Sequence, residues 1–339
     1  MRAFLKLGGL IVKSSTAAAL IALSSFALSV STARPQDADR ITRQQLDHTS
    51  FCAIGRKPPC TINTAVARGL FETGLHPRFA DGVKCRAIDS EKYAIDYTYK
   101  RNRPSRHGGI DMPAPFGTPI YAAAAGTVVG VYRGSGKGHQ GVHVILRHTP
   151  QDTGLPIWVY TVYAHLNKMP KLHVGEHLKM GDLIGPTGNS GASGAHKGGR
   201  RGGAGGGGGG EEGGRRRHQS GKRGGGGDGG GDFRFGRTYG GGGAGGGGGH
   251  HGVRRPALHF GVYYSAGPKY AALKGIVIPA DAHWMDPVAL FRKSAPFDSK
   301  SMRALPAAEK AVPIPYALMD GSVHPAGTKF IWPYRCERR

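Results

Sequence analysis

Three short motifs contain the side chains best suited to chemistry: HGGID at 107–111, YAHL at 163–166 and LHF at 258–260. The first and third offer two imidazoles and one carboxylate, a ligand set that suits zinc. Three protein ligands leave one tetrahedral position open for a water molecule, which the metal would make more acidic. The histidine of the second motif would move protons beside such a site. Together, and in this order, the motifs favour a metal-dependent hydrolase, although each one alone is weak.

The spacing within the motifs assigns the individual roles. His107 and Asp111 are separated by two glycines, which disfavour a helix, so a tight turn would bring both side chains to one point. His259 lies in a run typical of a strand, where positions 257 and 261 share its face. We therefore predict His107, Asp111 and His259 as metal ligands. His165 is predicted as a general base or transition-state stabiliser near the metal, with a buried, hydrogen-bonded structural histidine as the alternative.

The elements that must position these residues read as short strands. Runs rich in β-branched and aromatic residues alternate with glycine and proline turns, which predicts a compact antiparallel β domain. Within the run that ends at His165, alternate residues from Val159 to His165 are expected to share a face. The runs are Tyr93–Tyr99, Pro119–Tyr121, Gly126–Tyr132, Val142–Arg147, Ile157–His165, Leu183–Pro186 and Ala257–Tyr264.

An extension and a tail flank this domain, and a short closing element is expected near its end. Residues 34–91 are predicted to form a small N-terminal extension, partly helical around 62–72. Residues 286–291 are expected to form a short closing turn or helix. The proline-rich residues 293–339 are expected to form a tail that wraps the domain, because Trp332 and Cys336 need a place to be buried.

A glycine-rich segment interrupts the domain at 197–255. Of the 58 glycines in the chain, 30 lie between positions 198 and 249, and apolar residues for a core are lacking. Because ordering glycine costs much entropy, we predict a long disordered insertion. The net charge of +24, of which +8 comes from 197–255, favours anionic partners. Arg-Gly-Gly elements also occur in RNA-binding tails, so a nucleic-acid-binding protein is one alternative. The N-terminus, described next, predicts an exported protein. Because an exported protein rarely meets nucleic acid, a spacer or wall-binding loop is favoured instead.

The N-terminus predicts export. Arg2, Lys6 and Lys13 precede an apolar run at 16–30, and the small residues 31–33 could form a cleavage site. This pattern is typical of a signal peptide over residues 1–33. An uncleaved membrane anchor is the alternative, but the run is short and interrupted by serines. The mature protein is therefore expected in the periplasm or cell envelope, with no integral membrane span.

The four cysteines also fit an exported protein with disulfides. Three pairings are possible, and Cys52–Cys60 with Cys85–Cys336 is favoured, the second bond tying the tail to the start of the core. Because no cysteine lies in a CxxC pair or beside the histidine motifs, a structural role is expected rather than a metal or redox role.

These motifs carry a family resemblance. The segments 106–128, 163–166, 174–185, 187–190 and 258–260 resemble the lysostaphin/LytM-type peptidoglycan endopeptidases (metallopeptidase family 23), and Asp286-Pro287 resembles their closing element. The match covers 92–195 and 256–292, so a peptidase domain is expected at 92–292, interrupted by the insertion. The resemblance implies a barrel-like antiparallel β fold with a groove, Zn²⁺ at its floor, and cleavage of peptidoglycan peptides. It also implies zinc ligation by His107, Asp111 and His259, with His165 as the catalytic histidine.

One position departs from the family pattern. The family usually has His-x-His at the last motif, and here Ala257 takes the place of the first histidine. Loss of one polar stabiliser costs roughly two or three orders of magnitude in rate. The alternative function is therefore a weak or inactive homologue that binds peptidoglycan or regulates other wall hydrolases. A second alignment splits the motif at the insertion and lets His196 supply the missing imidazole, but a flexible loop positions a side chain poorly.

Overall fold

A computed structural model describes residues 38–56, 59–88, 107–134, 140–191 and 255–339. The predicted signal peptide, the run Tyr93–Tyr99, His196 and nearly all of the predicted glycine-rich insertion lie outside these residues. The domain boundaries derived from the sequence therefore stay predictions.

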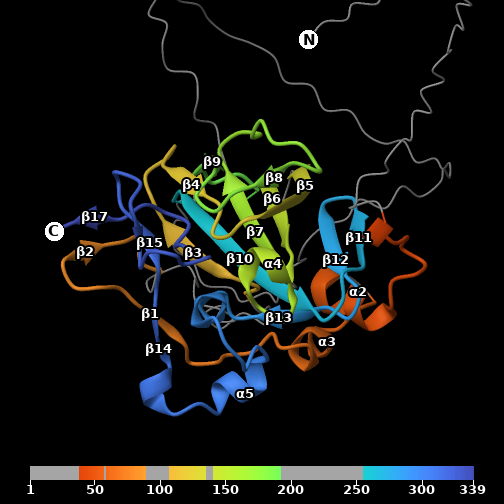
Figure 1. The fold of residues 1–339 in the computed structure, drawn as a ribbon. Helices are drawn as coiled ribbons and strands as arrows, with labels where there is room; N and C mark the ends of the chain where they lie inside the picture. Colours follow the sequence, from red (N-terminus) through yellow and green to blue (C-terminus); the bar gives the residue numbers. More distant parts are fainter. Residues whose placement is uncertain (1–37, 57–58, 89–106, 135–139, 192–254) are drawn as a thin grey trace, which may run out of the picture. The chain divides into compact units, whose positions relative to one another are not determined.

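A seven-stranded antiparallel sheet forms the centre of the fold (Figure 1). The order across it is β13, β10, β7, β6, β5 and β8, and β3 pairs with β10. The bounds are β3 Ile110–Pro113, β5 Gly126–Arg133, β6 Val142–His148, β7 Trp158–Leu166, β8 His177–Leu178, β10 Ala257–Ser265 and β13 His283–Met285. The prediction of a mainly β, antiparallel domain is confirmed.

The central strands are covered on both faces. Every residue of β6 is buried, and every residue of β7 except Trp158. On one face Tyr163 packs against Phe260 of β10, with ring centroids 5.3 Å apart. On the other face Tyr160 stacks on Tyr263, at 5.5 Å. Burial on both faces explains why these runs read as nearly continuous apolar segments rather than as strict alternation.

Short strand pairs surround the sheet. β1 His76–Arg78 pairs with β14 Ala311–Pro313, and β2 Val83–Lys84 pairs with β17 Glu337–Arg338. β4 Pro119–Tyr121 pairs with β9 Leu183–Pro186, and both have the predicted bounds. β11 Tyr270–Leu273 pairs with β12 Ile276–Pro279, and β15 Tyr316–Ala317 with β16 Val323–His324. The other strand predictions that fall on described residues are confirmed to within one residue at each end.

Helices are short and lie mainly outside the sheet. They are α2 His48–Gly55, α3 Ile62–Ala67, α4 Pro150–Thr153 and α5 Ser299–Arg303, with 3₁₀ turns η1 Pro287–Arg292 and η2 Ala307–Glu309. The helix predicted around 62–72 ends at Ala67, because Gly69 has a left-handed backbone with φ 95°. The predicted closing turn at 286–291 is confirmed as η1, which Asp286 caps. In the described part of the chain, no helix has the length and apolar character that crossing a membrane requires.

Two disulfides are present in the described residues, and both predicted pairings are confirmed: Cys52–Cys60, which joins residues eight apart, and Cys85–Cys336, which joins distant parts of the chain. The C-terminal segment is well packed, since Trp332 is fully buried and its indole N–H donates to the carbonyl of Arg86 at 2.8 Å.

The two described ends on either side of residues 192–254 lie together. The chain before this segment continues to Gly191 and resumes at Arg255. Close to these ends, the N–H of Ala257 donates to the carbonyl of Gly188 at 3.0 Å. The start of β10 therefore lies beside the end of the preceding described segment.

Candidate metal centre

The pairing of β3 with β10 brings two of the predicted ligands together. Asp111 lies directly opposite His259 in the antiparallel register, so both side chains emerge on the same face of the ladder. His107 lies three residues before β3. All three residues are buried, with 5 to 6% of each exposed.

The ligand atoms of the three residues converge on one point. Nε2 of His107 lies 2.9 Å from Nδ1 of His259 and 3.4 Å from Oδ1 of Asp111. Nδ1 of His259 lies 3.0 Å from the same carboxylate oxygen. The structure thus brings together all three residues that the sequence predicts as metal ligands.

The donor set fits a tetrahedral metal ion. Zinc ligands at about 2.0–2.1 Å from the ion are separated from one another by about 3.3 Å along the edge of a tetrahedron. The three measured separations, 2.9, 3.0 and 3.4 Å, scatter around that edge. Two nitrogens and one carboxylate oxygen are ligand types that zinc accepts. These three atoms would occupy three of the four positions around a tetrahedral ion.

The two glycines after His107 are required by close packing. A Cβ on Gly109 would lie 2.5 Å from the carbonyl oxygen of Phe260 and 2.8 Å from Cε1 of His259. A Cβ on Gly108 would lie 2.7 Å from Cη2 of Trp284. Because side chains cannot approach so closely, the HGGID motif uses glycine to press the turn against β10 and β13.

His165 lies beside this cluster, although one expectation about its strand is not met. Its ring centroid is 5.7 Å from that of His259, whereas the ring of Tyr163 packs on Phe260, the next residue of β10 and therefore on the opposite face. The expectation that Tyr163 and His165 share a face is therefore wrong. The backbone of His165 has φ 66°, a left-handed conformation that interrupts the alternation and turns the imidazole to the metal ligands.

A hydrogen bond to Ser190 helps to orient His165. Its Nδ1 lies 2.7 Å from the carbonyl oxygen of Ser190, so in the neutral ring Nδ1 carries the proton and Nε2 has the lone pair. The hydroxyl of Ser190 donates to the carbonyl of Leu166 at 2.6 Å and accepts from the N–H of Val142 at 2.9 Å. Ser190 thus fixes the segment that holds His165. Sequence reasoning gave it no role, although it ends the TGNS segment at 187–190.

Ala257 occupies the position where the sequence suggested a missing imidazole. It lies two residues before His259 on β10, opposite Pro113 of β3, and it is buried. Its methyl group therefore stands on the same face as the imidazole of His259. The second candidate for that imidazole, His196, lies outside the described residues.

The N-terminal extension reaches the edge of the centre. The indole N–H of Trp284 donates to the carbonyl of Ala53 in α2 at 2.9 Å. The guanidinium carbon of Arg56, which follows α2, lies 5.1 Å from the centre of the Trp284 ring, and its Nη2 lies 3.3 Å from where a Cβ on Gly108 would be. The extension therefore packs against the residue that follows His107.

One other group among the described residues has metal-ligand types in proximity. It consists of His48, Cys52 and Cys60, but the two cysteines are joined in a disulfide. A disulfide sulfur is a poor metal ligand compared with a thiolate. Of the two groups, only the one at His107 offers its ligands directly.

Comparison with known proteins identifies the segment that contains the first two motifs. Residues 105–197 match the model of Peptidase family M23. An uncharacterized metalloprotease of Haemophilus influenzae is 39% identical over 94 residues, which are 27% of this chain and 17% of that protein. The chain thus spans about a sixth of the length of this curated relative.

Solved structures give partial matches. The catalytic domain of the antimicrobial peptidase lysostaphin from Staphylococcus simulans matches at 24% identity and a TM-score of 0.24, over 30% of this chain and 71% of that one. The catalytic domain of a mutant of the prophage-encoded M23 protein EnpA from Enterococcus faecalis matches at 18% identity and a TM-score of 0.28, over 61% of this chain and 95% of that one.

Proposed function

We propose that this chain, whose residues 105–197 match the model of Peptidase family M23, is a zinc-dependent endopeptidase that hydrolyses peptide cross-links of bacterial peptidoglycan. The observation that carries the proposal is the convergence of Nε2 of His107, Oδ1 of Asp111 and Nδ1 of His259, all within 3.4 Å of one another. The resemblance of the surrounding motifs to peptidoglycan endopeptidases supports the choice of substrate.

The three ligands would hold the metal in a rigid frame. Asp111 and His259 are fixed by the ladder between β3 and β10, and His107 by the glycine turn packed against Trp284. When bound, zinc supplies a Lewis acid that polarises a peptide carbonyl and lowers the pKa of a water molecule. Burial of the three side chains excludes other water and strengthens their electrostatic interactions.

His165 would handle the proton and the developing charge. With Nδ1 bonded to the carbonyl of Ser190, Nε2 is the atom that accepts a proton in the neutral ring. Once protonated, Nε2 would donate a hydrogen bond to negative charge on the substrate carbonyl oxygen, or return the proton to the leaving amine. Ser190 acts as a positioning residue, because it sets the tautomer and the orientation of His165.

We also propose that the protein works outside the cytoplasm, in the periplasm or cell envelope. The signal-peptide pattern at 1–33 and the two disulfides support this location. Expression with the native N-terminus, followed by N-terminal sequencing of the extracytoplasmic fraction, should give a mature chain that begins at Arg34. Retention of residues 1–33 on a membrane-bound protein would instead favour an anchor.

Digestion of purified cell-wall sacculi by the mature protein, with and without a chelator, tests the activity. We expect soluble fragments whose masses identify the cleaved bond, loss of release with chelator, and recovery when zinc is added back. Asp111→Ala should release nothing, whereas His173→Ala, on an exposed loop, should match the wild type. Release that persists with chelator, or in Asp111→Ala, would contradict a metal-dependent mechanism.

The position of Ala257 favours a second candidate, a wall-binding or regulatory homologue with weak catalysis. Its methyl group stands on the same face as His259, where an imidazole would have faced the metal. Ala257→His separates the two functions: a gain of about 10²–10³ in rate would mean that the native centre is crippled. An unchanged rate in the variant, together with measurable release by the wild type, would support the endopeptidase.

A further inference from the structure

The Cys52–Cys60 disulfide differs on its two sides. It joins residues eight apart in the chain. Cys52, in α2, is 1% exposed, whereas Cys60, before α3, is half-buried. A thiol that approaches from solvent therefore meets the sulfur of Cys60 first.

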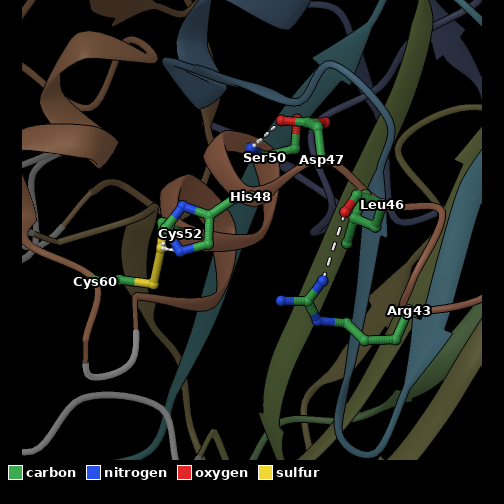
Figure 2. The surroundings of a disulfide bond; sticks show 7 residues. All are labelled: Arg43, Leu46, Asp47, His48, Ser50, Cys52 and Cys60. Carbon is green, nitrogen blue, oxygen red and sulfur yellow. Dashed lines mark hydrogen bonds between the residues drawn. A yellow bond between two sulfur atoms is a disulfide. The ribbon is translucent and has the colours of Figure 1, made fainter.

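An imidazole lies beside the buried sulfur. His48 precedes Cys52 by one helical turn, and residues four apart on a helix are neighbours on its surface. Nε2 of His48 lies 3.6 Å from Sγ of Cys52, and Nδ1 lies 4.0 Å from it. Figure 2 shows the ring lying against Cys52, with Cys60 on the far side of the bond. His48 itself is exposed.

This arrangement matches what thiol–disulfide exchange requires. A thiolate attacks one sulfur of a disulfide, and the other sulfur leaves with the electron pair of the broken bond. A neighbouring hydrogen-bond donor or cation speeds departure, because it stabilises the leaving thiolate. Here Cys60 is the less buried of the two cysteines, and the sulfur with an imidazole beside it belongs to Cys52.

We propose that Cys52–Cys60 is a thiol–disulfide exchange site that reacts with a dithiol, with Cys60 as the attacked sulfur and Cys52 as the leaving sulfur. One thiolate of the dithiol forms a bond to Cys60, the bond between Cys60 and Cys52 breaks, and Cys52 leaves as a thiolate that His48 stabilises before it takes up a proton. The second thiolate of the dithiol then attacks the first sulfur of the dithiol, which is bonded to Cys60 in the mixed disulfide. Cys60 is released and takes up a proton to become a thiol. The dithiol loses two electrons and becomes a disulfide, while the cysteine pair gains them.

The second disulfide provides an internal comparison. Cys85 is half-buried and Cys336 is fully buried, so this bond also presents one sulfur more than the other. However, the hydrogen-bonding partner that the described residues offer to Cys336 Sγ is the carbonyl of Tyr334, at 3.9 Å. A carbonyl has no proton to offer a leaving thiolate. The imidazole is therefore the feature that separates the two bonds, and it makes the proposal testable within one molecule.

The test is a time course of reduction. The folded full-length protein is mixed with dithiothreitol, quenched with acid at intervals and alkylated, and each cysteine pair is quantified by peptide mass spectrometry. We expect Cys52–Cys60 to open at least about tenfold faster than Cys85–Cys336. We expect His48→Gln to slow the first bond several-fold and leave the second unchanged, while the exposed control His173→Gln alters neither.

A monothiol shows which sulfur is attacked. With glutathione, the trapped mixed disulfide should be found on Cys60, with Cys52 alkylated. Equal reduction rates for the two bonds, an adduct on Cys52, or a wild-type rate in His48→Gln would each overturn the proposal. None of these measurements uses peptidoglycan or zinc, so they are independent of the proposed function.

Discussion

Two groups of three metal-ligand side chains lie in the part of the chain that the structure describes, and their surroundings differ in kind. His107, Asp111 and His259 are buried and held by a strand ladder. His48, Cys52 and Cys60 lie at a short helix near the surface, and two of them are bonded to each other. The sheet thus holds three side chains of metal-ligand type at fixed separations. Beside the helix, two of the three side chains form a disulfide bond, which can be made and broken. The difference shows that similar residue types serve different chemistry when the backbone around them differs.

The largest expected effect breaks the sheet-held group. Asp111→Ala removes the carboxylate that lies within 3.4 Å of both imidazoles, so zinc binding should fall from one ion to none. Peptidoglycan release should drop by at least about 10²–10³-fold. The matched variant in the other group, His48→Ala, should keep both zinc and activity. Metal content by mass spectrometry and release from sacculi check both variants, and loss of zinc in His48→Ala would remove the contrast.

The next effect compares the two disulfides as supports of the fold. They close segments of 251 and 8 residues. In the chain-entropy model, replacing both cysteines by serine should cost about 5 kcal/mol for the long segment and about 2.5 kcal/mol for the short one. Urea unfolding of the Cys85→Ser/Cys336→Ser and Cys52→Ser/Cys60→Ser variants measures the difference. Equal losses would contradict the dependence on the length of the closed segment.

The third effect concerns the pH dependence of the sheet. Burial is the main cause that lowers the pKa of His148 to about 4; the bond to the carbonyl of Ala125 and the charge of Asp152 raise it, and His177 lowers it further. The unfolded chain binds the proton near pH 6.5 and the folded chain does not. The free energy of unfolding should therefore be greatest above about pH 6.5 and fall by about 3 kcal/mol as the pH drops to about 4.

Urea unfolding at several pH values checks this dependence. His148→Gln should flatten the slope between about pH 6.5 and 4, while His177→Gln, at an exposed position, should keep most of it. An unchanged slope in His148→Gln would assign the acid sensitivity to other groups.

The smallest expected effect tests the contact between the helix α2 and the central sheet. Trp284→Phe removes the indole N–H that bonds to the carbonyl of Ala53 and keeps an aromatic ring for the edge-on contact with Tyr263. The free energy of unfolding should fall by about 1–2 kcal/mol, because one hydrogen bond is lost and one carbonyl is left unpaired. Urea unfolding measures it. A loss as large as that of a disulfide variant would show that α2 and the sheet form one unit rather than two regions in contact.

The strands were predictable because their signal is local. β4 and β9 have the predicted bounds, since Pro119 begins the first run and Gly181 and Pro186 lie at the two ends of the second. The helix α2 was missed because its eight residues carry no clear apolar period. Its start is set by the cap of Asp47, and its packing by a distant tryptophan. Sequence windows do not contain such tertiary contacts.

The residues of the candidate site could be proposed from the sequence, but their geometry could not. Ligand types and spacing pointed to His107, Asp111 and His259, because two imidazoles and one carboxylate form a ligand set that zinc accepts. The structure brings these three residues together, and their binding of a metal stays a prediction. The turn of His165 to these ligands depends on a left-handed backbone that alternation cannot predict. Its support by Ser190 depends on a loop from another part of the chain. Contacts of this kind follow from the assembled fold.

The hydrogen bond between Ala257 and Gly188 has a consequence for protein engineering. The described residues stop at Gly191 and resume at Arg255, and this bond holds Gly188 and Ala257, which lie close to the two ends, next to each other. A connection between ends that the fold itself holds adjacent can change in length at little cost, about 0.6 kcal/mol for each doubling. The chain could therefore be opened here to make new termini, or could accept a foreign domain, with β10 still in register beside β7.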